Sequence, residues 1–330
     1  MRGKIWIQIA IACGIAALIC CASGTAVDQP IVFATFAEQP HQLDNIRIMS
    51  ESIRRFGGEH RNAPIWLYVP QALKDRKSGA LNRLSELNVE IKTSTAPEDA
   101  LWFFFARKIF ASGQAEADAE GKAAILAWLD DDTIVLQEPR EFILPESKSL
   151  GYRPVMHKNI GLLYTEPVDA FWARAYEKMS VPESSLFPMV TPADGDTIRP
   201  YFNAGCMVVR PERHILRRWG EYFTALYQDS LLAEFCRQDV AKRIFIHQAA
   251  LTGAILNHVE QNDMLEFSNR INYPIFFKEM FGAKRDFRNL QDVVTFRYET
   301  YFRNPAPDWY EQLQGPADKI DWLKQHLNKK

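Results

Sequence analysis

The stretch Ala124-Ile-Leu-Ala-Trp-Leu-Asp-Asp-Asp-Thr-Ile-Val-Leu136 decides how this chain folds. Its first six residues form an unbroken apolar run, which is typical of a strand buried on both faces of a sheet. Three adjacent aspartates, Asp130, Asp131 and Asp132, begin where that run stops. In open α/β sheets, ligands bind in the crevice beyond the carboxyl ends of the strands. The stretch therefore predicts a central strand with a binding site at its end.

The residues before this stretch alternate between strand-like and helix-like segments. Residues 31–36 are β-branched or aromatic, and apolar residues then recur at steps of three and four over 43–56. Two further apolar runs, at 65–69 and 89–91, are expected strands. Repeated β-α-β units predict a Rossmann-like mixed, mainly parallel sheet flanked by helices.

More elements are expected along the rest of the chain. They are a helix over 98–112, strands over 151–155 and 161–164, a helix over 168–179, a strand over 206–209, a helix that begins near Pro211 and another that begins after Gln248. No internal repeat or clear linker is present, so residues 27–330 are expected to form a single domain.

Residues 1–26 differ from the rest of the chain. Arg2 and Lys4 precede an apolar run over 5–21, and small residues follow at Gly24 and Ala26. This pattern predicts a signal peptide or an N-terminal membrane anchor. We therefore expect a protein that is exported or membrane-anchored (secretory lumen, periplasm or cell envelope), with possible membrane association through the N-terminus; cytoplasmic catalysis stays open.

The overall charge excludes one class of partner. With 39 basic and 41 acidic residues, the formal net charge is -2. A nucleic-acid-binding protein normally carries a basic excess, so no nucleic acid is expected as a partner. Only Cys206 and Cys236 lie beyond the leader. Both lie among apolar residues, and we expect them to be buried structural thiols.

The aspartate trio has a chemical reading and a structural one. Adjacent carboxylates repel one another, and a cation would compensate that repulsion. Alternate side chains of an extended segment share a side, so Asp130 and Asp132 can face one ion while Asp131 points away. Oxygen ligands of this kind suit magnesium, manganese or calcium. The structural reading is a solvated strand end, or turn and helix-cap residues.

Two segments carry a resemblance to a known family. Trp128-Leu-Asp-Asp-Asp-Thr-Ile-Val-Leu136 resembles the DXD strand end of glycogenin and related retaining glycosyltransferases, and Phe202-Asn-Ala-Gly-Cys-Met-Val-Val209 resembles their Phe-Asn-Ala-Gly segment. His247-Gln-Ala-Ala-Leu251 resembles their Asp-Gln pair, which opens a helix. The resemblance implies the nucleotide-diphospho-sugar transferase superfamily and its A-type glycosyltransferase fold.

The resemblance also implies roles for individual residues. Asp130 would contact the donor ribose or a metal, and Asp132 would bind the Mn2+ or Mg2+ that bridges the donor diphosphate. Asn203 and Gly205 would line the sugar pocket, and Gln248 would approach the transferred sugar. Gln248 and Asn203 are the expected catalytic residues. The expected donor is a nucleotide sugar, with UDP as the expected nucleotide, and the acceptor is unknown.

Two weaker assignments follow from the same resemblance. Thr35, at the end of the first strand, would lie under the nucleotide base. Lys108 or Arg107 would meet the donor phosphates, although a basic pair on a helix is more often solvated.

The sequence departs from the family pattern at two places. His247 stands where the family has an acid; by its place beside Gln248 it is expected to bind the substrate, but a histidine cannot serve as a carboxylate towards sugar hydroxyls. The family's C-terminal His-x-x-Gly-x-x-Lys motif, which supplies a metal ligand, has no counterpart here. Arg297 follows a late strand-like segment; it could neutralise a diphosphate directly, although a surface cation is the commoner role.

These observations predict a hexosyltransferase that uses a nucleotide-diphosphate donor and a DXD-bound metal. One alternative is an exported, non-catalytic module that keeps the transferase fold to bind sugar or a partner. A minor alternative is a haloacid dehalogenase-type phosphatase, whose Asp-x-Asp motif fits Asp130 and Asp132. That phosphatase motif normally follows the first strand, whereas this one follows three earlier candidate strands.

Overall fold

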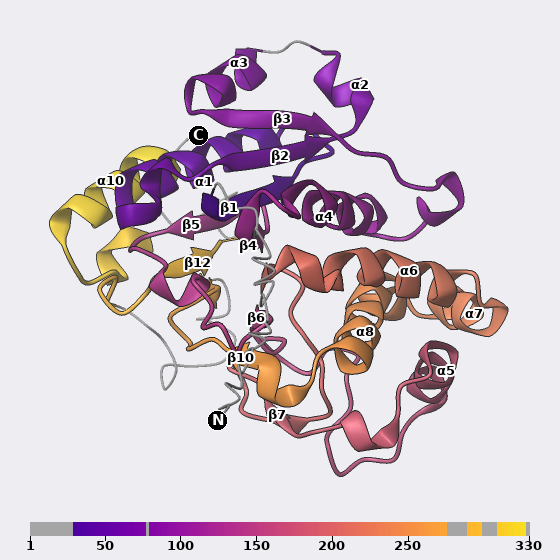
Figure 1. Ribbon diagram of the computed structural model, residues 1–330. Helices are drawn as coiled ribbons and strands as arrows, with labels where there is room; N and C mark the ends of the chain where they lie inside the picture. The colour runs from indigo at the N-terminus through magenta and orange to yellow at the C-terminus, as the bar shows by residue number, and fades with distance from the viewer. Residues whose placement is uncertain (1–28, 77–78, 276–288, 299–308, 328–330) are drawn as a thin grey trace, which may run out of the picture.

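A computed structural model describes residues 29–76, 79–275, 289–298 and 309–327 (Figure 1). The main sheet has seven strands in the order β10-β6-β9-β4-β1-β2-β3. These are β1 (Gln29–Phe36), β2 (Ile65–Val69), β3 (Val89–Thr93), β4 (Ala123–Leu129), β6 (Leu150–Tyr152), β9 (Cys206–Val209) and β10 (Met264–Glu266). β1 to β4 run parallel, and β9 is antiparallel to both of its neighbours. The predicted mixed, mainly parallel sheet is confirmed.

Helices cover both faces of this sheet (Figure 1). The α-helices are α1 (Gln42–Phe56), α2 (Gln71–Lys74), α3 (Gly79–Glu86), α4 (Ala106–Ala119), α5 (Ala170–Met179), α6 (Ile215–Tyr227), α7 (Ser230–Gln238), α8 (Val240–His258) and α10 (Ala317–Leu327). The 3-10 helices are η1 (Gly58–Asn62), η2 (Glu98–Ala100), η3 (Arg140–Phe142), η4 (Glu183–Ser185), η5 (Pro211–Arg213), η6 (Gln261–Asp263) and η9 (Trp309–Gln312).

The alternation of side chains along the strands creates two cores. Val32 and Ala34 of β1 face the core formed with α4, α6 and α8. Ile31 and Phe33 point the other way, into the core formed with α1 and α3. Because both faces are covered, β1 and β4 read as continuous apolar runs rather than as alternating ones. Cys206 and Cys236 are both buried and free, which confirms the expectation for these thiols.

A small second sheet lies beside the end of β4. It consists of β11 (Tyr273–Pro274), β12 (Thr295–Arg297) and β5 (Thr133–Val135), in that order. β5 follows the aspartate trio directly, and β12 is antiparallel to it. Leu323 and Leu327 of α10 share a third core with Ile134 of β5. The chain therefore returns to the trio near its C-terminal end.

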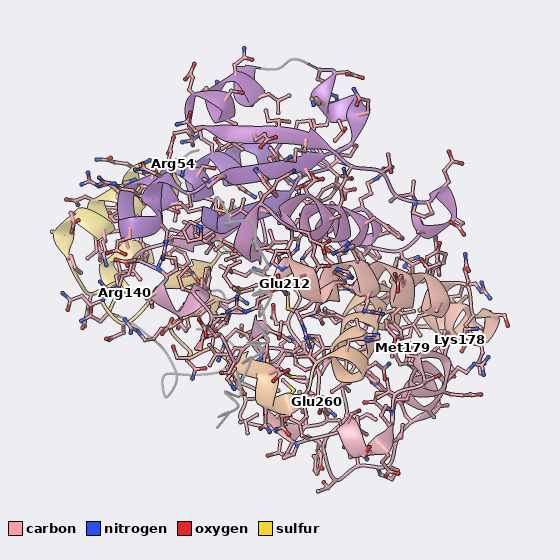
Figure 2. All side chains as sticks on the ribbon, in the orientation of Figure 1. Arg54, Arg140, Lys178, Met179, Glu212 and Glu260 are labelled. Carbon is pink, nitrogen blue, oxygen red and sulfur yellow. The ribbon has the colours of Figure 1, made fainter. Side chains whose placement is uncertain are left out.

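A hairpin and a helix pair complete the half of the protein around α8. The hairpin is formed by β7 (Met189–Val190) and β8 (Thr197–Ile198). Met179, labelled in Figure 2 at the end of α5, packs against Gly253 of α8, where an added Cβ would overlap its side chain. Asn257 Nδ2 donates to the Met179 carbonyl at 2.8 Å. A side-chain-free position on α8 thus lets these two helices approach closely.

Five predicted elements differ from the structure. The strand expected over 151–155 ends at Tyr152, and the helix expected near Pro211 starts as the 3-10 helix η5 and is α-helical only from Ile215. The aromatic helix expected over 98–112 begins only at Ala106, because Phe105 has a φ of 63°, in the left-handed region that no α-helix contains. The helix expected after Gln248 begins earlier, at Val240, where the Asp239 carboxylate accepts from the N–H groups of the first turn. Residues 161–164 form no strand and contribute one isolated bridge.

No helix in the described ranges has the length and apolarity that crossing a membrane requires. The leader predicted over residues 1–26 lies outside the described residues.

Glu116 joins α4 to the start of α6. Its carboxylate accepts from Leu216 N at 3.0 Å and from Arg217 N at 2.9 Å, and the side chain is fully buried. These two donors belong to the first turn of α6, whose N–H groups have no partner within the helix. Burial raises the pKa of Glu116 to about 7, although its hydrogen bonds and the charge of Arg217 act in the opposite direction.

We predict that the stability of the protein falls as Glu116 loses its proton. Because the pKa is raised from 4.5 to about 7, the protonated group stabilises the fold fully below pH 4.5, and that contribution is lost as the pH rises through 7. The neutral variant Glu116→Gln loses one acceptor and has no such titration. The variant should be less stable than the wild type at pH 5. This difference in unfolding free energy should shrink by on the order of 2 kcal/mol between pH 5 and pH 8, as measured by urea unfolding. A deficit that stays constant over this range would contradict the prediction.

Candidate active site

The trio lies at the carboxyl end of β4, where three distant segments meet. Asp130 directly follows the strand, and its backbone N–H donates to the Gly205 carbonyl at 2.9 Å. The turn 203–205 precedes β9, which pairs antiparallel with β4. The two segments that were singled out from the sequence are therefore adjacent in the structure.

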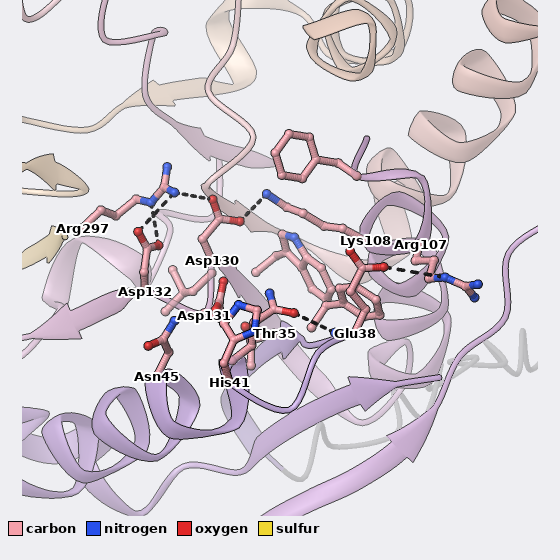
Figure 3. Close-up of a pocket in the computed structure, with 15 residues that line it drawn as sticks. Thr35, Glu38, His41, Asn45, Arg107, Lys108, Asp130, Asp131, Asp132 and Arg297 are labelled. Atoms are coloured by element: carbon pink, nitrogen blue, oxygen red, sulfur yellow. Dashed lines mark hydrogen bonds and ion pairs between the residues drawn. The ribbon is translucent and has the colours of Figure 1, made fainter. Parts of the chain in front are cut away.

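Asp130 and Asp132 share one cation, the Arg297 guanidinium (Figure 3). Arg297 Nη2 lies 2.9 Å from Asp130 Oδ2, and its Nε lies 3.0 Å from Asp132 Oδ1. Lys108 forms a second ion pair with Asp130. Asp131 accepts instead from Asn45 Nδ2 at 2.9 Å. The predicted separation of Asp131 from its two neighbours is thus observed, with the Arg297 guanidinium between Asp130 and Asp132.

Arg297 reaches the trio through main-chain pairing. It ends β12, whose register places it opposite Thr133, the residue that follows the trio. Its side chain is 15% exposed. The interpretation of Arg297 as a surface cation is therefore wrong, because the small sheet carries it to the carboxylates.

The protonation of the cluster follows from its surroundings. Burial raises the pKa of Asp130, but the charges of Lys108 and Arg297 outweigh this effect and hold the pKa below its ordinary value. Asp131 has a pKa raised to about 7 by burial and by the charge of Asp132. Burial and the neighbouring Lys108 lower the pKa of His247 to about 3. The site thus holds one firmly ionised carboxylate beside Lys108 and a neutral imidazole.

Gly205 leaves room for the charged groups. A Cβ at this position would lie 2.7 Å from Arg297 Nη1 and 2.8 Å from Asp130 Oδ2. Real Cβ atoms almost never approach other atoms so closely. Because Gly205 has no side chain, Arg297 and Asp130 can approach each other beside it. The same open space could also admit a ligand.

Two cavities meet at this cluster. Their volumes are 390 Å3 and 300 Å3, which is within the usual range for small-molecule sites. Both are lined by Phe105, Lys108, Asp130 and Arg297. The charged groups therefore lie at the junction of two adjoining binding spaces.

The larger cavity contains Thr35, Trp128 and Arg107. Thr35 Oγ1 and Trp128 Nε1 are buried and have no hydrogen-bond partner in the described parts of the chain. Unsatisfied buried polar atoms are costly, and a polar ligand could relieve that cost. Arg107 contacts Glu38 at the rim, at 3.7 Å.

The smaller cavity is lined by Asn203, His247, Gln248 and Asn272. Gln248 Oε1 and Asn272 Oδ1 are buried without a partner among the described residues. Asn203 Oδ1 accepts from Gly205 N at 2.8 Å, so this side chain also stabilises the turn. His247 Nδ1 donates to the Ile244 carbonyl at 2.6 Å, which leaves the lone pair on Nε2. The four predicted residues of the second half, Asn203, Gly205, His247 and Gln248, are all brought together here.

Phe105 and Asn272 belong to the site but were not predicted. Phe105 is 46% exposed, lines both cavities and contacts the His247 ring, with centroids 4.7 Å apart and ring planes tilted by 48°. A bulky residue with a positive φ is uncommon, and such strain concentrates at functional sites. The Trp-Phe-Phe-Phe run at 102–105 was a signal for it. Asn272 offered no signal in the sequence.

The predicted metal site can be compared with these contacts. Two carboxylates would suit Mg2+, which is often held by one or two carboxylates together with phosphate oxygens. An ion in contact with both Asp130 and Asp132, however, would have to displace the guanidinium of Arg297. Within the described ranges, no group of three or more His, Cys, Asp or Glu side chains is arranged to hold a metal. The Mn2+ or Mg2+ predicted here stays a prediction, and the observed ion pairs do not fit it.

Comparison with known proteins gives a family. The model of the Rhodobacterales glycosyltransferase domain matches residues 37–258, which extend from the end of β1 to the end of α8. A comparison with curated proteins gave no significant match.

Several solved structures are similar to this chain. Mouse xyloside xylosyltransferase 1, in its apo form, is 15% identical with a TM-score of 0.46, covering 85% of this chain and 100% of its own. The galactosyltransferase LgtC in complex with donor and acceptor sugar analogues is 17% identical, with a TM-score of 0.42 and coverages of 91% and 94%. The glycosyltransferase GlyE of Streptococcus pneumoniae TIGR4 is 13% identical, with a TM-score of 0.43 and coverages of 92% and 61%.

We predict that Gly205→Ala destabilises the protein by about 2 kcal/mol, because the added methyl group would push apart Asp130 and Arg297. The matched control is Gly220→Ala in α6, where the nearest atom to an added Cβ is 3.6 Å away and alanine favours the helix. Urea unfolding measures both. Equal stabilities of the two variants would contradict the prediction, because they would show that a methyl group at position 205 does not displace Asp130 or Arg297.

Proposed function

This chain belongs to the Rhodobacterales glycosyltransferase domain family, and from that premise we propose that it moves a sugar from a nucleotide-diphosphate donor to an acceptor at the two adjoining cavities. The proposal rests on the charged residues at the junction of the two cavities. Lys108, Asp130 and Arg297 line both spaces, so a molecule that occupied the two cavities would pass over these charged groups. A nucleotide sugar has this layout, with a diphosphate between two uncharged ends.

In this proposal the larger cavity receives the nucleoside. Thr35 Oγ1 and Trp128 Nε1 are available there to a base or ribose, since both are buried without a partner in the described ranges. The Thr35 assignment is the one implied by the family resemblance. The identity of the nucleotide, with UDP as the expected one, belongs to the proposal.

The smaller cavity receives the sugar in the same proposal. Gln248 and Asn203 are its proposed catalytic residues, because both line this cavity beside the cluster. The unpaired Gln248 Oε1 would accept from a sugar hydroxyl. His247 is neutral, so it can accept a hydrogen bond through Nε2 but cannot balance a developing positive charge. Gly205 lies at the edge of this space.

The transfer breaks the bond between the anomeric carbon and the diphosphate oxygen, and the nucleoside diphosphate leaves with that electron pair. The acceptor's nucleophile forms the new bond to the anomeric carbon and gives up its proton. Negative charge therefore grows on the leaving diphosphate. A cation fixed beside it, such as Lys108, would stabilise the transition state more than the ground state.

Both alternatives from the sequence can be compared with this proposal. The phosphatase alternative expects the Asp-x-Asp motif after the first strand, whereas the trio follows β4 and lies beside the antiparallel β9. The family match also favours a transferase over a phosphatase. A non-catalytic module would have the same two cavities, but unlike the proposed transferase it would not turn over a donor.

The location and extent of the protein are part of the proposal. We keep the predicted signal peptide or membrane anchor over residues 1–26, with an exported or membrane-anchored location. Residues 27–330 are proposed to act as one domain. An acceptor near a membrane would agree with that location.

We predict that the full chain hydrolyses at least one nucleotide sugar in a panel of UDP- and GDP-linked hexoses, or transfers its sugar to an acceptor. Release of the nucleoside diphosphate measures either reaction. Gln248→Ala should lower kcat/KM by about 10- to 100-fold, as expected for a lost hydrogen bond to a bound sugar. The control Gln238→Ala changes an exposed glutamine of α7 and should have wild-type activity. Donor binding without release of product would favour the non-catalytic module, and release of phosphate from simple esters would favour the phosphatase.

A further inference from the structure

We propose that Arg297 and Lys108 together take the place of a divalent cation in this site, so that a guanidinium and an ammonium neutralise the donor diphosphate. This inference rests on the proposed function, because it assumes a diphosphate at the junction of the cavities. It concerns the same site and changes what the two outer aspartates do there.

The first support is the geometry of Arg297. Its guanidinium contacts Asp130 through Nη2 at 2.9 Å and Asp132 through Nε at 3.0 Å. These are the lengths of strong charge-assisted hydrogen bonds. A metal held by both carboxylates would need the same space and would be repelled by the same positive charge. Arg297 therefore occupies the position that the DXD pattern assigns to an ion.

The second support is the charge of the cluster. Arg297 and Lys108 carry two positive charges, which is the charge of one divalent ion, and they face the two carboxylates of Asp130 and Asp132. Three of these four side chains line both cavities. The two cations thus match the charge of Asp130 and Asp132, as one divalent ion would.

The third support is that the fold builds this arrangement. The pairing of β12 with β5 fixes Arg297 opposite Thr133, one residue after the trio. Gly205 leaves the space into which Arg297 Nη1 fits. Lys108 comes from α4 and is itself buried. The two cations therefore come from two separate elements, β12 and α4, and both contact Asp130. The fold thus fixes this arrangement.

Lys108 also has capacity for a ligand. An ammonium has three N–H groups, and within the described ranges Asp130 is the one carboxylate that contacts Lys108. Two N–H groups of Lys108 therefore remain for phosphate oxygens at the junction. Asp130 and Asp132 then act as positioning residues, which hold the cations towards the cavities.

The test is calorimetric binding of UDP and of GDP to the full-length protein, once with EDTA and once with Mn2+. We expect the dissociation constant of the nucleotide that binds to agree within about twofold between the two conditions. Arg297→Gln should weaken binding by about 10- to 100-fold, the effect of a charged hydrogen bond. Arg140→Gln, which alters an exposed arginine paired with Glu138, is the control and should bind as wild type does.

A second measurement does not depend on nucleotide. The electron paramagnetic resonance signal of free Mn2+ should persist when wild-type protein is added, and it should decrease with Arg297→Gln, which removes the guanidinium that contacts both carboxylates. Because the wild-type measurements involve no substitution, they stay decisive even if that variant fails to fold.

Three outcomes separate the possibilities. Metal-independent binding that Arg297→Gln weakens supports the inference. Binding of UDP or GDP only in the presence of Mn2+ overturns the inference and leaves the proposed function intact. Absence of binding under both conditions overturns the proposed function and the inference together.

Discussion

The two ion pairs that Arg297 forms with Asp130 and Asp132 are the constraint on which the rest of this site depends. Three carboxylates at the end of a buried strand repel one another, and an unpaired buried charge costs several kcal/mol. Arg297 joins Asp130 to Asp132, and Lys108 adds a second positive charge to Asp130. These two cations therefore offset the cost of burying Asp130 and Asp132.

Each part of the fold near the trio serves that requirement. β4 ends at Asp130, the antiparallel β9 brings the Gly205 turn beside it, and β12 returns from the end of the chain with Arg297. α4 contributes Lys108 from a helix that starts late because of the backbone at Phe105. Three of the side chains that make these contacts, Lys108, Asp130 and Arg297, also line both cavities at their junction. Stability and ligand access are thus determined by one group of side chains.

Much of this architecture could be predicted from the sequence, because it depends on local pattern. The apolar run before Asp130 identified β4, and the β-α-β repeats identified the mainly parallel sheet. The partner of the trio could not be predicted in the same way. Arg297 reaches Asp132 through a three-residue strand whose pairing joins positions far apart in the chain, and no periodicity records such a pairing. The left-handed backbone at Phe105 and the contribution of Asn272 are likewise tertiary features that local propensity does not contain.

A crystal structure of the protein grown with UDP and Mn2+, with data collected at the manganese absorption edge, would show directly whether Arg297 and Lys108 take the place of a metal. We expect phosphate oxygens within hydrogen-bonding distance of Lys108 Nζ and of the Arg297 guanidinium, with no anomalous peak between Asp130 and Asp132. An anomalous peak coordinated by both carboxylates, with Arg297 displaced from them, would contradict it.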